Sequence, residues 1–226
     1  MTSLLANPAP AKSPARVRLQ GKHVAVVPLD PLLHGEALFL HTCGADKEHL
    51  WRYLHEGPFD TREAFDDYLR RKTAAFDPQL YAIVDTGSGL ALGLAAYMRI
   101  TPEHRVIEVG NILFSRRLQK TAAATEAMYL MARHAFEGLG YRRYEWKCDS
   151  VNEPSRQAAL RLGFQFEGIF RQHMIVKGRN RDTAWYSMLD TEWPLCKAAF
   201  ETWLAPGNFD EAGRQKLSLS AVRAAI

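Results

Sequence analysis

The chain alternates between segments whose apolar residues recur at every second position and segments where they recur every three to four positions. The first kind, together with short runs rich in β-branched residues, predicts seven strands. Segment 142–150 is the clearest case, because Tyr144, Trp146 and Cys148 interleave with charged residues, as in a strand with one buried face. The strands are expected at 23–29, 79–85, 90–100, 105–114, 142–150, 166–176 and 183–190.

Apolar residues at helical spacing predict helices between and after these strands. Thr61 and Asn152 are residue types that cap helix starts, and Gly138 and Gly163 are placed to end helices. The order of strands and helices predicts an α/β fold, a mixed sheet with helices on both faces. The helices are expected at 34–43, 46–54, 61–76, 121–136, 152–163, 195–204 and 209–222.

Composition and charge divide the chain into three parts. Residues 1–20 contain three prolines and few large apolar residues, which predicts a flexible basic leader; a folded domain is expected over 21–193 and a C-terminal helical extension over 194–226. Residues 1–22 hold four of the 29 Lys and Arg residues and no acid, which leaves 25 charges of each sign in the remainder. A neutral body does not favour a nucleic-acid partner.

The three cysteines, Cys43, Cys148 and Cys196, lie far apart and form no CxxC pair. This usage is typical of a reducing compartment, so we expect a cytoplasmic protein with neither a disulfide framework nor a metal site. No apolar run approaches the ~18 residues that a membrane span needs, so no membrane partner is expected.

Several short segments after residue 106 follow one another in an order that can be compared with known families. They are Ile107-Glu108-Val109-Gly110, Arg117 to Ala122 followed by Thr125-Glu126-Ala127, Asn152-x-x-Ser155, Leu162-Gly163-Phe164, and Lys177-Gly178 to Asp182. In order and spacing they resemble the GNAT acetyltransferase superfamily, specifically the branch of ribosomal-protein N-terminal (Rim-type) acetyltransferases. The resemblance covers roughly residues 20–193. It implies a GNAT-like, mostly antiparallel sheet of six to seven strands, with the C-terminal helices added.

The resemblance also implies an enzyme that uses acetyl-CoA as co-substrate and moves its acetyl group directly to a primary amine. A strand-to-helix junction suits the pyrophosphate of coenzyme A, because it offers unpaired N–H groups at the positive end of a dipole. Lys120 stands where the family usually has glycine. The residues implied in cofactor binding are Ile112, Leu113, Phe114, Arg116, Arg117, Gln119, Lys120, Thr121, Ala122, Asn152 and Ser155.

Two residues are candidates for the chemistry. Glu108 lies in a mostly apolar strand, where a carboxylate is costly unless it is paired or functional, so we expect either a general base or an ion pair with Arg105 or Arg142. Ser155 resembles the hydroxyl that protonates the departing thiolate; helix capping is the alternative for this residue and for Asn152. Some Rim-type members carry a glutamate where this chain has Met174, and the adjacent His173 is a second candidate base.

Trp51, Tyr53 and Phe59 lie in the segment that overhangs the acceptor site in this family, which makes them candidate substrate contacts. Core packing is the alternative for Trp51. The acceptor implied first is a protein N-terminus of the ribosomal-protein type, and a small-molecule amine is the alternative. A non-catalytic acyl-CoA-binding regulatory module is a further alternative. The C-terminal helices are candidates for a homodimer contact or a lid.

Overall fold

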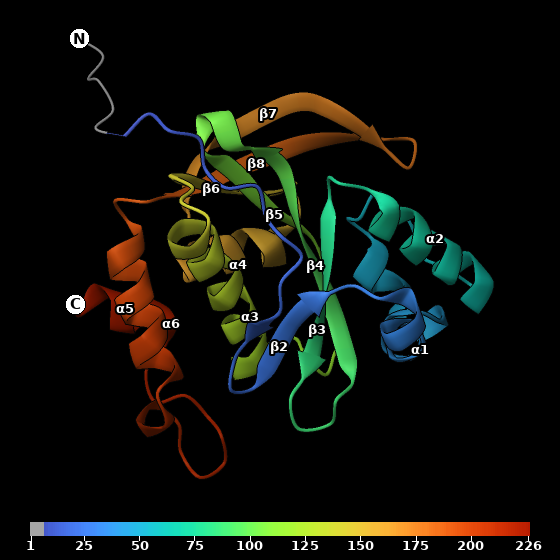
Figure 1. Ribbon diagram of the computed structural model, residues 1–226. Coiled ribbons are helices and arrows are strands. Elements are labelled where there is room, and N and C mark those ends of the chain that lie inside the picture. The colour runs from blue at the N-terminus through green and yellow to red at the C-terminus, as the bar shows by residue number, and fades with distance from the viewer. Residues whose placement is uncertain (1–6) are drawn as a thin grey trace.

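A computed structural model describes residues 7–226. Its centre is one eight-stranded sheet in the order β1-β2-β3-β4-β5-β6-β8-β7 (Figure 1). All neighbouring strands pair antiparallel except β5 and β6, which are parallel. The bounds are β1 Leu19–Gln20, β2 Val24–Pro28, β3 Gln79–Asp85, β4 Ala91–Thr101, β5 Val106–Phe114, β6 Arg143–Asp149, β7 Gln165–Val176 and β8 Arg179–Leu189.

The α/β class and the mostly antiparallel sheet are confirmed, with one strand more than expected. The additional strand is β1, whose two residues pair with Val26 and Ala25 of β2. A two-residue strand has no room for a period of two, so the hydrophobic pattern could not reveal it.

Helices cover both faces of the sheet (Figure 1). One core cluster lies beneath α3, α4, α5 and α6, and a second lies between α1, η1, α2 and strands β2 to β5. The bounds are α1 Pro31–Thr42, η1 Ala45–Trp51, α2 Arg62–Ala74, η2 Pro102–His104, α3 Ala122–Arg133, η3 His134–Gly138, α4 Glu153–Leu162, α5 Trp193–Leu204, η4 Pro206–Asn208 and α6 Leu219–Ala224.

Side-chain caps fix several helix starts, as the sequence predicts for Thr61 and Asn152. Thr61 accepts a hydrogen bond from the Ala64 amide at 3.2 Å, and Thr121 accepts one from Ala124 at 3.1 Å. The prediction for 209–222 is wrong: only Leu219–Ala224 is helical. The Asp210 carboxylate accepts hydrogen bonds from the backbone amides of Ala212 and Arg214, which closes a turn instead of a helix.

The expected flexible leader is not free over its described part. The amides of Ala11 and Lys12 donate to the carbonyls of Pro102 and Leu139, each at 2.9 Å. Further along, the side-chain nitrogen of Gln79 donates to the Pro14 carbonyl at 3.1 Å. The segment 11–18 therefore straps β3 to the connection after α3. The first six residues lie outside the described part.

The C-terminal helices belong to the main core and do not form a separate layer. Cys196, Phe200 and Trp203 of α5 and Leu219 and Val222 of α6 lie in the same buried cluster as α3.

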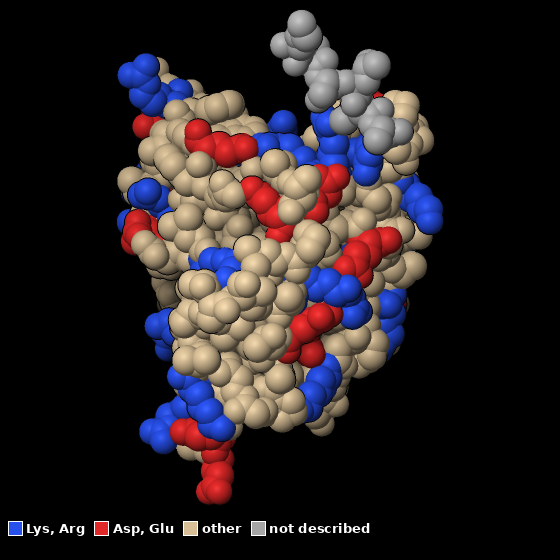
Figure 2. All heavy atoms as spheres, turned by 90° about the vertical axis from the view of Figure 1, so that its left-hand side faces the viewer, with Lys and Arg blue, Asp and Glu red and all other residues tan. Residues whose placement is uncertain are grey.

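On the face that carries α5 and α6, acidic and basic side chains intermingle without a patch of one sign (Figure 2). On this face, the distribution agrees with the balance of charges expected from the sequence.

Candidate active site

The sheet opens between its two parallel strands. β5 pairs with β6 only over Val106–Val109 against Arg143–Trp146. β6 then continues alongside β8 as far as Asp149, whereas β5 stays with β4 through an irregularity where Asn111 has φ 49°. Among the described residues, the edge of β5 that faces β6 therefore has no strand partner over 110–114. Unpaired strand edges bind extended chains that carry amide groups, and the pantetheine arm of coenzyme A is such a chain.

A basic loop follows this open edge and leads into α3. Lys120 has φ 60°, the left-handed conformation that favours glycine, so the loop keeps the backbone expected of the family with a lysine in that place. Among the described residues, the amides of 120–123 have no hydrogen-bond acceptor. Arg116, Arg117 and Lys120 are exposed beside them. Free amides at a helix start, flanked by cations, fit a pyrophosphate.

The remaining cofactor candidates differ in what they can offer. The side chain of Leu113 is buried in the second core cluster, so only its backbone can reach the opening. Ile112 and Phe114 are half-buried, and Gln119 donates from its side-chain nitrogen to the Phe114 carbonyl at 2.8 Å. Ala122 begins α3 directly after the Thr121 cap.

Asn152 and Ser155 lie at the start of α4, next to the end of β6. Asn152 accepts a hydrogen bond from the Ser155 amide at 3.3 Å, which is the capping role that the sequence offered as the alternative. The hydroxyl of Ser155 accepts a hydrogen bond from the Trp146 indole nitrogen at 3.0 Å. Since an indole nitrogen only donates, the Ser155 proton stays available for another acceptor.

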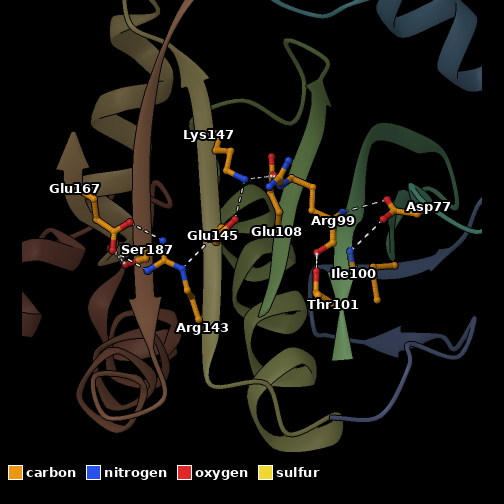
Figure 3. Close-up of polar contacts among 10 residues, drawn as sticks. All are labelled: Asp77, Arg99, Ile100, Thr101, Glu108, Arg143, Glu145, Lys147, Glu167 and Ser187. Carbon is orange, nitrogen blue, oxygen red and sulfur yellow. Dashed lines mark hydrogen bonds and ion pairs between the residues drawn. The ribbon is translucent and has the colours of Figure 1, made fainter. Parts of the chain in front are cut away.

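Glu108 is 5% exposed and lies on the face of the sheet opposite α3. Its carboxylate contacts the Lys147 ammonium at 2.9 Å and lies 3.6 Å from the Arg99 guanidinium (Figure 3). The expected partners are therefore wrong; Arg105, for example, donates to the Gly140 carbonyl instead. Burial raises the pKa of Glu108, and the nearby charge of Lys147 only partly opposes this.

Lys147 links two glutamates. Its ammonium lies 2.8 Å from Glu145 and 3.7 Å from the centre of the Trp185 ring, and its side chain is 6% exposed. Burial opposes ionisation of Glu145 as well, yet hydrogen bonds from Lys147 and Arg143 outweigh it and lower the pKa of Glu145. The two carboxylates thus differ in basicity, as in sites that divide acid and base roles.

Sequence reasoning missed Lys147, Glu145 and Arg99. The alternation over 142–150 marked the polar face of β6, but that pattern is equally typical of a strand whose polar face meets water. Here the parallel register places Glu108 beside Glu145, and Trp185 of the neighbouring β8 packs against the Lys147 ammonium that links them. Because a single sequence does not show which strands are neighbours, it does not reveal that these polar side chains are buried in a charged network.

On the acceptor side, Trp51 has no exposed surface. Its ring packs edge-on against Phe59, Phe65 and Tyr68, which is the core role named as the alternative, so its side chain lines no opening. Phe59 is half-buried in the same aromatic group. Tyr53 is half-buried and donates from its hydroxyl to the Val151 carbonyl at 3.4 Å, directly before α4.

The β7–β8 hairpin arches toward the α2 side of the molecule (Figure 1). At its tip Lys177 donates to the Trp51 carbonyl at 2.9 Å, so the hairpin meets the segment between η1 and α2. His173, the second candidate base, lies on this hairpin with Nδ1 2.9 Å from the Thr183 hydroxyl, and Met174 pairs with Arg181. The structure does not bring His173 into contact with Glu108.

An opened seam between parallel strands, followed by a basic loop at a helix start, defines a protein of the coenzyme A-dependent acyltransferase class. Residues 27–165 match the family described as the acetyltransferase (GNAT) domain. The chain belongs to this GNAT acetyltransferase family, in which acetyl-CoA is the acetyl donor.

Similar proteins agree with this family. A crystal structure of a GCN5-related N-acetyltransferase from Brucella melitensis is 47% identical, with 97% of this chain and all of that chain covered and a TM-score of 0.95. The "Putative ribosomal N-acetyltransferase YdaF" of Bacillus subtilis is 28% identical over 146 residues, 63% of this chain and 78% of that protein. The match to the uncharacterized N-acetyltransferase YoaA of the same species, 29% identical, spans 43% of this chain and 55% of that protein.

Within residues 7–226, no three or more His, Cys, Asp or Glu side chains are grouped to hold a metal ion. In the same range, no helix combines the length and apolarity that crossing a bilayer requires.

Proposed function

We propose that this chain transfers the acetyl group of acetyl-CoA directly to a primary amine, with Glu108 as general base. The observation that carries the proposal is the placement of a buried carboxylate of raised pKa on β5, directly before the opening of the sheet. A carboxylate with a pKa nearer to neutrality accepts a proton from an ammonium group more readily than an ordinary one. Acetyl-CoA supplies the activated acyl group.

The other residues of the site have supporting roles in this proposal. The amides of 120–123, with Arg116, Arg117 and Lys120, would hold the pyrophosphate. The open edge of β5 over Ile112–Phe114 would hold the pantetheine arm and provide an amide that polarises the thioester carbonyl. Ser155, whose proton is not used by Trp146, would donate to the departing thiolate. Asn152 keeps Ser155 at the helix start.

For the acceptor, we propose a protein N-terminus first, supported by the relative YdaF, whose name describes a ribosomal N-acetyltransferase. A small-molecule amine is the alternative. A non-catalytic acyl-CoA-binding module is less well supported, because Lys120 adopts the backbone conformation of the usual glycine. We also propose a cytoplasmic location, supported by three buried free cysteines; a homodimer through the C-terminal helices stays a prediction.

A transfer assay tests the proposal. Purified protein is incubated with acetyl-CoA and a panel of N-terminal peptides and small amines, and products are identified by mass spectrometry. With a good acceptor, Glu108→Gln should lower kcat by about 10²-fold. The exposed Glu103→Gln is the matched control and should change kcat little. Coenzyme A binding without transfer to any amine would favour the regulatory module instead.

The pH profile tests the base assignment itself. Glu108 must be ionised to accept a proton, so kcat/KM of the wild type should fall as pH drops through its raised pKa. In Glu108→Gln this acid limb should be absent. An unchanged limb in the variant would assign the titration to another group.

A further inference from the structure

Arg181 is a buried cation without a counter-charge. It lies on β8, is 8% exposed, and has no carboxylate oxygen within 4.0 Å anywhere in residues 7–226. Its Nε is buried and has no hydrogen-bond acceptor. A guanidinium stays charged inside proteins, and buried charges are normally paired. An unpaired buried arginine therefore indicates that its partner comes from outside the chain.

Within residues 7–226 the side chain of Arg181 makes one polar contact, which supports this interpretation. Its Nη1 lies 3.3 Å from Nε2 of His55. A guanidinium only donates, so His55 accepts with Nε2 and is neutral in this contact. Burial and the charge of Arg181 lower the pKa of His55, which agrees with a neutral imidazole. His55 is itself exposed, so a neutral and accessible acceptor occupies a place that an anion would fill better.

The acids near this position are already engaged. Glu56, next to His55, is held by Lys72 at 2.6 Å and Arg71 at 2.9 Å. Asp182, next to Arg181, accepts hydrogen bonds from the Gln172 amide and the Asn180 side chain. Lys177 at the hairpin tip adds a second cation, which contacts only a carbonyl. The local charge that faces the segment 51–55 is therefore positive.

Arg181 also lies on the strand that contacts the turn before Ser155. The backbone carbonyl of the next residue, Asp182, accepts a hydrogen bond from the Ser150 amide at 2.8 Å, where β6 passes into the turn that leads to Ser155. Burial raises the pKa of the Cys148 thiol, whereas a hydrogen bond with Ser155 and the charge of Arg181 lower it. Tyr53 binds the same turn at Val151. An acceptor whose amine reaches the opening could place an anionic group against Arg181.

We propose that Arg181 binds a carboxylate of the acceptor, so that this protein prefers amines that carry a carboxylate near the amino group. The proposal rests on the transfer proposed above. A carboxylate takes two parallel hydrogen bonds from a guanidinium, displaces His55 from it, and neutralises the buried charge. The carboxylate can belong to a free amino acid or to an acidic first residue of a peptide.

Matched acceptors test the preference. CoA release is measured with free amino acids against their amides, and with peptides that begin with Asp or Glu against peptides that begin with Asn or Gln. The carboxylate form of the preferred acceptor should have a kcat/KM about 10- to 100-fold higher. The arm that shows the difference identifies the source of the carboxylate. Equal rates with both members of every pair would overturn the proposal.

The variant Arg181→Gln should remove the preference by raising KM for the carboxylate acceptor, with KM for acetyl-CoA unchanged. Arg181→Lys should restore part of the preference, since it keeps the charge without the fork. Arg179→Gln on the same strand, where the side chain is exposed, is the control. If Arg181→Gln weakened acetyl-CoA binding and affected both acceptor forms equally, Arg181 would serve the cofactor.

A binding measurement separates this proposal from the transfer reaction. N-acetylglycine and N-acetylglycinamide differ only in the carboxylate, and neither can accept an acetyl group at a primary amine. N-acetylglycine should shift the NMR signal of the His55 imidazole in the wild type but not in Arg181→Gln, and the amide should have little effect. If no amine were acetylated while this shift remained, only the transfer would be contradicted. An equal response to both compounds would overturn the carboxylate site.

Discussion

At the scale of residues, one lysine supports two carboxylates with different roles. Glu145 forms ion pairs with Lys147 and Arg143 and stays ionised. Glu108 shares Lys147, but its second cation, Arg99, is more distant. Removing one partner from a buried ion pair leaves an uncompensated charge, which costs much more than the pair contributed. Lys147 is therefore a structural residue, and in the proposed mechanism it also positions Glu108.

Lys147→Met should affect stability and the pH profile together. Without the ammonium, the pKa of Glu108 rises further, so the acid limb of kcat/KM should move to higher pH. The free energy of unfolding should fall by about 3 kcal/mol in urea denaturation. Lys197→Met removes a surface pair with Glu137 and should cost less than about 1 kcal/mol. An acid limb of kcat/KM that stays at the same pH would show that Lys147 does not control the pKa of the group that titrates.

Lys120 is a second residue whose role can be divided experimentally. Lys120→Gly should raise the free energy of unfolding by about 0.5–1 kcal/mol, because glycine tolerates the φ of 60°. Lys120→Ala loses the same charge but keeps the strain. Both variants should weaken coenzyme A binding equally in calorimetry if the charge matters, and only the glycine variant should gain stability. A stability gain with alanine as well would contradict the assigned strain.

The sequence predicted part of the site at this scale. Glu108 stands out because a carboxylate in an apolar strand needs a reason, and Lys120 stands out against the family pattern. Lys147 and Arg181 gave no such signal, since each lies in a segment rich in charges. Their burial arises from β8, which packs beside β6 and is covered by the segment around His55. Such long-range contacts are absent from any local pattern.

At the scale of elements, periodicity located nearly all strands and helices. It failed at 209–222, where the Asp210 carboxylate binds backbone amides and closes a turn. The helix expected at 46–54 is present as the 3-10 helix η1, which ends three residues earlier. It also described the helices after Pro194 as an extension. Their apolar residues in fact complete the core beneath α3, so we expect this part of the chain to contribute to stability.

Trp203→Ala tests this role of α5. The side chain is 3% exposed and its indole nitrogen donates to Gln215 at 2.9 Å. Loss of a buried tryptophan should lower the free energy of unfolding by about 3–5 kcal/mol. Leu195→Ala on the same helix removes a side chain that is 45% exposed and should cost far less. Similar losses in the two variants, measured by denaturation, would argue against a core position for Trp203.

At the scale of the whole molecule, the strap at 11–18 ties regions that are distant in sequence. It provides carbonyl acceptors for Gln79 and Tyr81, two polar side chains that are 2% and 1% exposed. Part of the net positive charge of the chain therefore lies in a segment with a structural role. Arg16, for example, donates to the Thr73 and Ala75 carbonyls.

Deleting residues 1–17 should lower the free energy of unfolding by about 2 kcal/mol, because both side chains lose their acceptors. The strap does not contact the residues of the proposed site, and sites without shared contacts usually act independently. At a temperature where the protein stays folded, kcat/KM should therefore change by less than about twofold. Deleting residues 1–8 keeps these contacts and is the control. A large loss of kcat/KM with unchanged stability would show that the leader serves catalysis.

The opening between β5 and β6 has a consequence for the life of the protein in a cell. A strand edge left unpaired by the chain is finished only when a ligand lies along it, so coenzyme A would act as a removable part of the sheet. Ligand at 100 times its Kd adds about 2.7 kcal/mol to stability. Resistance to proteolysis, and with it abundance, should then follow the supply of acetyl-CoA, which would tie the amount of this enzyme to the metabolic state that feeds it.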